Sequence, residues 1–231
     1  MPPSLSIVVP VYNEATFIPS ALPKLIAAVE EVGASYTILI VENGSTDGTA
    51  EVARAEIGDA NVVVESLPTP DYGAAMRHGF LAAHGDWVVN FDIDYFSGSF
   101  LNQLLAQPDD VDLVIGSKRD PGSQDRRPLI RRIATWVFNL LLTVILGSKV
   151  SDTHGMKGFR RELVEDIGPT VISTQDLFDT ELVVRAERAG YSIVEVPVVV
   201  EEMRTARSSL IKRAPRTVIG LIRMRRLIRQ G

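Results

Sequence analysis

Two aspartates separated by one residue directly follow a short apolar run, and their types and spacing suit metal chemistry. The run covers residues 87–91, and Asp92 and Asp94 come next. Like charges this close repel one another, so a positively charged partner is expected to offset the repulsion. A hard divalent cation is such a partner, because it binds carboxylate oxygens and shares its site with substrate phosphates. The pair therefore predicts a Mg²⁺ or Mn²⁺ site, with solvated turn aspartates as the alternative.

Apolar runs that alternate with helical patterns would position these aspartates. The runs lie at residues 6–11, 36–41, 61–65, 87–91 and 114–117. Such near-continuous Val/Ile runs indicate parallel strands that are covered on both faces. Polar, Gly-containing loops follow the first strands and precede helices, where free backbone N–H groups favour phosphate. Strand ends that meet at one edge of an α/β sheet thus predict a site for a nucleoside diphosphate and its metal.

Composition narrows the class of protein and the kind of partner. A chain of 231 residues with 45% hydrophobic residues is expected to form one large domain, or a domain with a small appendage, and the absence of cysteine excludes disulfides and thiol catalysis. All 29 acidic residues precede Arg204, whereas nine of the 24 basic residues lie from Arg204 onward. This basic segment predicts an anionic partner. No nucleic-acid-binding signature is present, so an anionic membrane surface is favoured, and a solvated helix packed on the domain is the alternative.

A second segment also points to a membrane surface. Residues 133–146 are an apolar run of fourteen residues, preceded by Arg131 and Arg132. This run is too short to span a bilayer, which needs about 20 residues, so we expect a partly buried helix with an exposed apolar face. No basic region followed by an apolar stretch opens the chain, so we expect a cytoplasmic protein held peripherally on the cytoplasmic face of the membrane.

Several motifs together resemble a known family. Residues 9–14, 41–49, 72–75, 92–94 and 152–160 occur in the order and spacing of family 2 glycosyltransferases with the GT-A fold. Residues 178–182, 189–191 and 195–198 are similar to the dolichyl- and polyprenyl-phosphate sugar synthases of that family. The resemblance runs from about residue 5 to about residue 212. It implies an α/β fold, with a Rossmann-like, mostly parallel sheet flanked by helices.

The resemblance also implies a division of the chain. Residues 1–209 would form the catalytic domain, with a nucleotide-sugar half at 1–117 and an acceptor half at 118–209. Residues 210–231 would form a basic amphipathic tail.

Site residues can be carried over from the family motif by motif. Asp92 and Asp94 would hold Mg²⁺ or Mn²⁺. The nucleotide-binding residues would be Pro10, Tyr12, Glu14, Glu42, Asn43, Gly73 and Asp92. Two departures stand out, because relatives usually carry two aspartates where this chain has Glu42 and Asn43, and a metal-binding Gln where it has Phe96. Water or Ser97 would then replace the missing metal ligand.

The acceptor side is carried over in the same way. Its phosphate would be bound by Lys118, Arg131, Arg132 and Arg204. The catalytic residues would be Asp92, Asp94, Lys118, Arg132 and Asp179. Asp152 and Lys157 could brace each other beside the sugar, and His154 reads as structural.

The implied activity is inverting transfer of a hexose from a nucleotide-diphosphate sugar to a polyprenyl monophosphate at the membrane. GDP-mannose is the favoured donor and UDP-glucose the next. The second pKa of a lipid phosphate is about 6, so the nucleophilic dianion is present at neutral pH and no strong base is needed to form it. Two alternatives remain: transfer to a soluble or glycan hydroxyl with Asp179 as the base, and a non-catalytic nucleotide-sugar binding protein.

Overall fold

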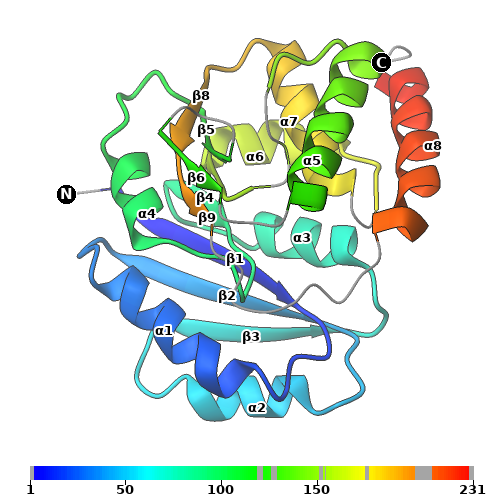
Figure 1. The fold of residues 1–231 in the computed structure, drawn as a ribbon. Coiled ribbons are helices and arrows are strands. Elements are labelled where there is room, and N and C mark those ends of the chain that lie inside the picture. Colours follow the sequence, from blue (N-terminus) through cyan, green and yellow to red (C-terminus); the bar gives the residue numbers. More distant parts are fainter. Residues whose placement is uncertain are drawn as a thin grey trace.

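The protein is described by a computed structural model (Figure 1). It covers residues 3–118, 122–125, 129–150, 153, 155–174, 177–200 and 210–228, with the backbone alone described at 125, 131, 200 and 210–216. The strands are β1 (Leu5–Val11), β2 (Tyr36–Asn43), β3 (Val62–Leu67), β4 (Trp87–Asn90), β5 (Leu113–Ser117), β6 (Gln124–Asp125), β7 (Lys157–Arg160), β8 (Ile193–Pro197) and β9 (Val199–Val200).

Helices connect most of these strands. They are α1 (Ile18–Glu30), α2 (Thr49–Glu56), α3 (Tyr72–Leu81), α4 (Gly98–Leu105), α5 (Leu129–Leu141), the π-helix η1 (Leu142–Leu146), α6 (Arg161–Ile167), the 3-10 helix η2 (Gly168–Thr170), α7 (Phe178–Ala189) and α8 (Leu210–Ile228). Figure 1 shows α1, α2 and α4 toward one side of the sheet and α3, α6 and α7 toward the other. The expected α/β class with a helix-flanked sheet is confirmed.

A seven-stranded sheet in the order β3-β2-β1-β4-β7-β5-β8 forms the centre of the described structure. β1 pairs in parallel with β2 and β4, β2 with β3, and β5 with β8, whereas β7 lies antiparallel between β4 and β5. Every strand of this sheet except β7 therefore runs in one direction. The carboxyl ends of β1, β2, β4 and β5 consequently meet at the same edge, where the sequence predicts the site.

Two hydrophobic layers hold the sheet. Val/Ile side chains alternate along each strand, so one set packs beneath α1 and α4 and the other beneath α3, α6 and α7. Phe80 contacts Phe159 and Phe178 edge-on, with ring centroids 5.4 and 5.9 Å away. Burial on both faces explains why these strands read as continuous apolar runs in the sequence.

A third, smaller cluster joins the C-terminal helix to the domain. Leu221 and Met224 of α8 are buried against Leu142 and Leu146 of η1 and Val184 of α7. Figure 1 shows α8 alongside α5 and α7. Within the described residues, no helix is both long and apolar enough to cross a bilayer. The basic segment thus has one apolar side packed on the domain.

Candidate active site

The loops after β1 and β2 are joined by hydrogen bonds between them. Asn13 has a left-handed backbone with φ 52°, a conformation that Asn tolerates better than most residues. Its N–H donates to Ser45 Oγ at 2.9 Å, and its Oδ1 accepts from the Thr46 N–H at 2.9 Å. The Glu14 N–H donates to Thr49 Oγ1 at 2.9 Å. The two loops are therefore held as one unit beside the carboxyl ends of both strands.

Glu42 and Asn43, at the end of β2, help to shape these loops. Both are buried; the Glu42 carboxylate accepts from the Ser45 N–H, and Asn43 Oδ1 accepts from the Asp71 N–H at 2.8 Å. Asp71 in turn caps α3 by accepting from the Ala74 N–H at 3.1 Å. The residues that replace the usual pair of aspartates thus connect the β2 loop to itself and to the start of α3. Their predicted contact with a nucleotide stays a prediction.

The remaining predicted nucleotide-binding residues lie along the same edge. Tyr12 is 44% exposed, which leaves its ring available to cover a base. Glu14 and Gly73 are buried, and Gly73 lies in the first turn of α3. Pro10 is half-buried inside β1 rather than at its end.

Asp92 is electrostatically perturbed at this edge. Burial among protein atoms, together with the charges of Asp94 and Asp179, raises the pKa of Asp92 from 3.8 to about 6, although Lys157 and Lys118 act in the opposite direction. The side chain nevertheless keeps solvent exposure, so it lies at the surface rather than inside the core. A dense group of negative charges open to solvent is the environment in which a divalent cation binds favourably.

The segment after β4 positions this group. The backbones of Asp92 and Tyr95 exchange two hydrogen bonds, of 3.2 and 3.0 Å, which close the turn that carries Asp94. Lys118, directly after β5, lies 5.4 Å from the centre of the Tyr95 ring. The structure thus places Lys118 near enough to Asp92 for its positive charge to lower the pKa of that carboxyl, and its predicted contact with the acceptor phosphate stays a prediction.

Phe96 and Ser97 have structural contacts of their own. Phe96 packs on the core beneath α1 and α4, and Ser97 Oγ caps α4 by accepting from the Phe100 N–H at 3.2 Å. A hydroxyl that already caps a helix is a poor replacement for a missing metal ligand.

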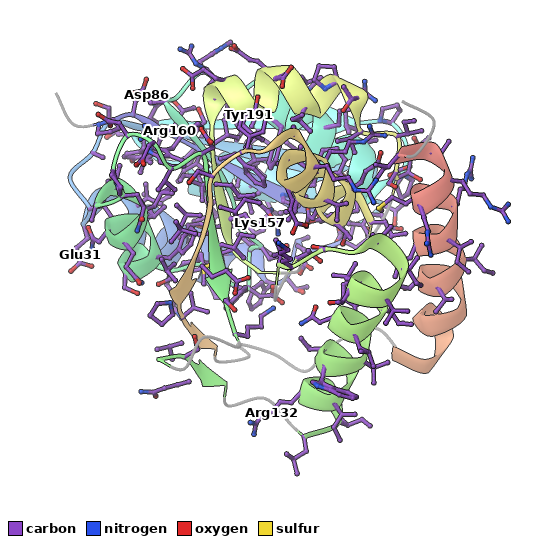
Figure 2. All side chains as sticks on the ribbon, turned by 90° about the horizontal axis from the view of Figure 1, so that it is seen from above. Glu31, Asp86, Arg132, Lys157, Arg160 and Tyr191 are labelled. Atoms are coloured by element: carbon purple, nitrogen blue, oxygen red, sulfur yellow. The ribbon has the colours of Figure 1, made fainter. Side chains whose placement is uncertain are left out.

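A buried polar network beside Asp92 is the main feature that the sequence did not predict. Lys157 is 1% exposed, and its Nζ donates to Gly155 O at 2.6 Å and to Asn90 Oδ1 and Asp179 Oδ2 at 3.4 Å each. The Tyr72 hydroxyl donates to the same Asp179 Oδ2 at 3.0 Å. Figure 2 shows Lys157 in the middle of the molecule, among the side chains enclosed by the sheet and helices. One signal in the sequence was available, because Asn90 is a polar residue in an otherwise apolar strand.

Two of the predicted acceptor-phosphate residues, Arg131 and Arg132, lie on α5. Arg132 is exposed near the N-terminal end of α5, apart from Lys157 (Figure 2). Arg131 lies on the same helix, with only its backbone described. Arg204, Asp152 and His154 fall outside the described residues. Lys157, which we expected to brace Asp152, pairs with Asp179.

The residues at this edge fit a cation that is shared with a ligand. No group of three or more His, Cys, Asp or Glu side chains among the described residues has the geometry to hold a metal by itself. Mg²⁺ usually takes one or two carboxylates and completes its shell with water and substrate phosphates. Asp92 and Asp94 suit that arrangement, and a bound cation would relieve the repulsion that raises the pKa of Asp92.

Comparison of the sequence with known proteins finds related glycosyltransferases. The family model described as "Glycosyl transferase family 2" matches residues 6–168. A protein of Mycobacterium tuberculosis, named as an uncharacterized glycosyltransferase, is 36% identical over 197 residues, which are 84% of each chain. The glycosyltransferase AglD of Haloferax volcanii is 30% identical over 84% of this chain and 32% of its own length.

Solved structures agree on the fold. The glucosyl-3-phosphoglycerate synthase of Mycobacterium tuberculosis, crystallised with Mn²⁺, UDP-glucose and phosphoglyceric acid, superposes with a TM-score of 0.71 at 22% identity. The match covers 96% of this chain and 79% of that one. The same enzyme with Mg²⁺ and UDP gives a TM-score of 0.69 at 22% identity. At this identity the likeness concerns the arrangement of the elements.

Proposed function

Because the chain belongs to glycosyl transferase family 2, we propose that it transfers a hexose from a nucleoside-diphosphate sugar to a polyprenyl monophosphate at a membrane surface, with inversion at the anomeric carbon. The observation that carries the donor half is the group formed by Asp92, Asp94 and Lys118 at the carboxyl edge of the sheet. Mg²⁺ or Mn²⁺ bound there would neutralise the leaving diphosphate. Of the structures that share the fold, one was crystallised with Mn²⁺ and UDP-glucose and another with Mg²⁺ and UDP.

In this proposal the protein acts by positioning and by charge. The loops after β1 and β2 hold the nucleoside, and Lys118 adds positive charge where the diphosphate leaves. At neutral pH the acceptor phosphate is largely the dianion, because its second pKa is about 6. No side chain is then needed to remove a proton from the nucleophile.

The acceptor half is supported by an exposed apolar surface. We call it the α5 face, and it consists of Leu129, Ile130, Ile133, Trp136, Val137, Leu140 and Val144, each between 42% and 70% exposed. Spacings of one, three and four residues place them along one side of α5 and η1. Arg132 lies within this stretch, and the exposed Ile219, Ile222 and Arg223 lie on the neighbouring α8. Apolar residues bordered by basic ones match the interface of an anionic membrane.

A transfer assay tests the proposal. Purified protein is incubated with Mn²⁺, a short polyprenyl phosphate in anionic vesicles, and radiolabelled GDP-mannose or UDP-glucose in parallel. We expect one label to enter an organic-extractable, mild-acid-labile lipid, and we expect EDTA or Asp94→Asn to abolish the transfer. Asp110→Asn serves as the control, because Asp110 is an exposed carboxylate that precedes the N-terminal end of β5, whereas Lys118 follows its carboxyl end.

Other outcomes of this assay would contradict the proposal. Label found only on a water-soluble glycan acceptor would indicate the alternative with a hydroxyl nucleophile. Donor binding without transfer to any acceptor would indicate a non-catalytic binding protein.

A further inference from the structure

Asp179 presents one carboxylate oxygen that no described residue satisfies. The Tyr72 hydroxyl and the Lys157 ammonium both donate to Oδ2, at 3.0 and 3.4 Å. Oδ1 is buried and accepts no hydrogen bond from the described part of the chain. A buried acceptor left unpaired destabilises the fold, so native structures rarely keep one without a reason.

The position of this oxygen connects it to the donor site. The antiparallel register of β4 and β7 sets Lys157 opposite Asn90, two residues before Asp92. The first residues of α3 and α7 add Tyr72 and Asp179 to the same place. Asp179 lies close enough to Asp92 that its charge helps to raise the pKa of Asp92. A group attached to a diphosphate held at Asp92 and Asp94 would therefore extend toward Asp179.

The chemistry of Asp179 selects among possible partners. Its negative charge is already matched by the ammonium of Lys157, which would repel a second cation at this carboxylate. Oδ1 can only accept, so its partner must be a hydrogen-bond donor. Near the diphosphate of a nucleoside-diphosphate sugar, the donors are the hydroxyls of the hexose and of the ribose, and in the proposed function the loops after β1 and β2 hold the ribose as part of the nucleoside.

We infer that Asp179, held in place by Tyr72 and Lys157, accepts a hydrogen bond through Oδ1 from a hydroxyl of the transferred hexose. The inference rests on the proposed function and adds the group that orients the sugar. In this role Asp179 binds the donor sugar, and Lys157 and Tyr72 are positioning residues that fix which oxygen is free. The bond exists only when a sugar is attached to the nucleotide, so Asp179 distinguishes the full donor from the bare nucleoside diphosphate.

Calorimetry with two kinds of ligand tests this inference. The affinities of UDP-glucose and UDP, and of GDP-mannose and GDP, are measured with Mn²⁺ for the wild type and for Asp179→Asn. The Asn amide can take two orientations. With its NH₂ at the position of Oδ1, the acceptor for the sugar hydroxyl is lost; with its NH₂ at the position of Oδ2, it meets the Tyr72 and Lys157 donors. We expect the nucleotide sugar to bind about ten- to a hundredfold more weakly to the variant. The bare nucleoside diphosphate should change by less than about twofold, because it lacks the sugar hydroxyl.

Nucleotide sugars that lack one hydroxyl of the hexose provide a second test. Their affinities would not depend on Asp179 in a hydroxyl-specific way if Asp179 had only a structural role. One deoxy analogue of the donor should bind the wild type as weakly as the full donor binds Asp179→Asn, with no further loss in the variant. Asp166→Asn is the matched control, because Asp166 accepts from the Tyr191 hydroxyl at 2.7 Å in a similar pair elsewhere. Figure 2 shows Tyr191 apart from Lys157. If Asp179→Asn does not fold, the double variant Asp179→Asn/Lys157→Met removes the buried pair together, and the same selective loss is expected.

The outcomes separate this inference from the proposed function. If the wild type binds neither nucleotide sugar, the proposed function and this inference both fail. If Asp179→Asn binds the nucleotide sugar as the wild type does, or loses the bare nucleotide to the same extent, only the role of Asp179 is overturned. An additive loss for every deoxy analogue in the variant would mean that water, and not the sugar, occupies Oδ1.

Discussion

Removing the charge of Asp92 should stabilise the metal-free protein while it weakens metal binding. In the folded protein, burial and the charges of Asp94 and Asp179 raise the pKa of Asp92 from 3.8 to about 6. The folded state therefore holds the Asp92 proton more tightly than the unfolded state does. At neutral pH the ionised side chain destabilises the fold, and Asp92→Asn removes this repulsion without changing the shape of the side chain.

The size and the pH dependence of the effect follow from the shift in pKa. The shift corresponds to about 3 kcal/mol, and because Asp92 keeps solvent contact we discount this to about 1 kcal/mol. The destabilisation by Asp92 is fully present above about pH 6, where Asp92 is ionised in both the folded and the unfolded protein. It fades as the pH falls toward 4. For a chain of 231 residues, about 1 kcal/mol raises the Tm by roughly 2–4 °C.

Thermal unfolding in EDTA checks this prediction. We expect Asp92→Asn to melt above the wild type at pH 7.5 and to lose most of that advantage at pH 4.5. Added Mn²⁺ with a nucleoside diphosphate should then raise the Tm of the wild type more than that of the variant, because ligands stabilise the state that binds them. Asp110→Asn, at an exposed position, should do neither. A variant that melts below the wild type in EDTA at pH 7.5 would refute the assignment of electrostatic strain to Asp92.

Three further predictions address the acceptor side and the loops. Arg132→Ala should raise the apparent KM for lipid phosphate by an amount equivalent to about 1.5–3 kcal/mol and leave donor affinity unchanged; an equal loss of donor affinity would place Arg132 on the nucleotide. Trp136→Ser with Leu140→Ser on the α5 face should abolish co-sedimentation with anionic vesicles without lowering the Tm, since both side chains are exposed; unchanged sedimentation would exclude this face as the membrane contact. Asn13→Ala should lower stability by about 1–2 kcal/mol and weaken nucleotide binding, because it removes the acceptor for the Thr46 N–H from a left-handed position; unchanged nucleotide affinity by calorimetry would show that this contact between the loops is dispensable.

Most of the sheet could be predicted from the sequence because its strands are buried on both faces. Runs such as residues 36–41 are apolar throughout, and the polar loops after them mark the edge at which ligands bind. The antiparallel insertion of β7 into the sheet could not be predicted in this way. The strand has four residues and includes a lysine, and its place between β4 and β5 depends on pairing with segments far away in the sequence.

The candidate site divides in a similar manner. Asp92 and Asp94 are adjacent to one strand, so their spacing alone shows that their charges meet. The network of Tyr72, Asn90, Lys157 and Asp179 joins four separate elements, and Tyr72 and Asp179 are 107 residues apart. Each of these residues is unremarkable by itself, because an ordinary lysine or tyrosine is solvated. Only burial, which removes water as a partner, shows that the four depend on one another.

The proposed donor site and the proposed acceptor surface are stabilised by different interactions, and this difference has a functional consequence. At the donor end, hydrogen bonds join the loops of β1 and β2, and a buried ion pair fixes Asp179, so small changes there alter the geometry. At the acceptor end, the α5 face meets solvent and depends on apolar area and charge, which many side chains can supply. Substitutions along the α5 face should therefore change which lipid surface the protein contacts while donor binding persists. The substitutions that change which sugar is bound should fall instead on Asp179 and the residues that hold it.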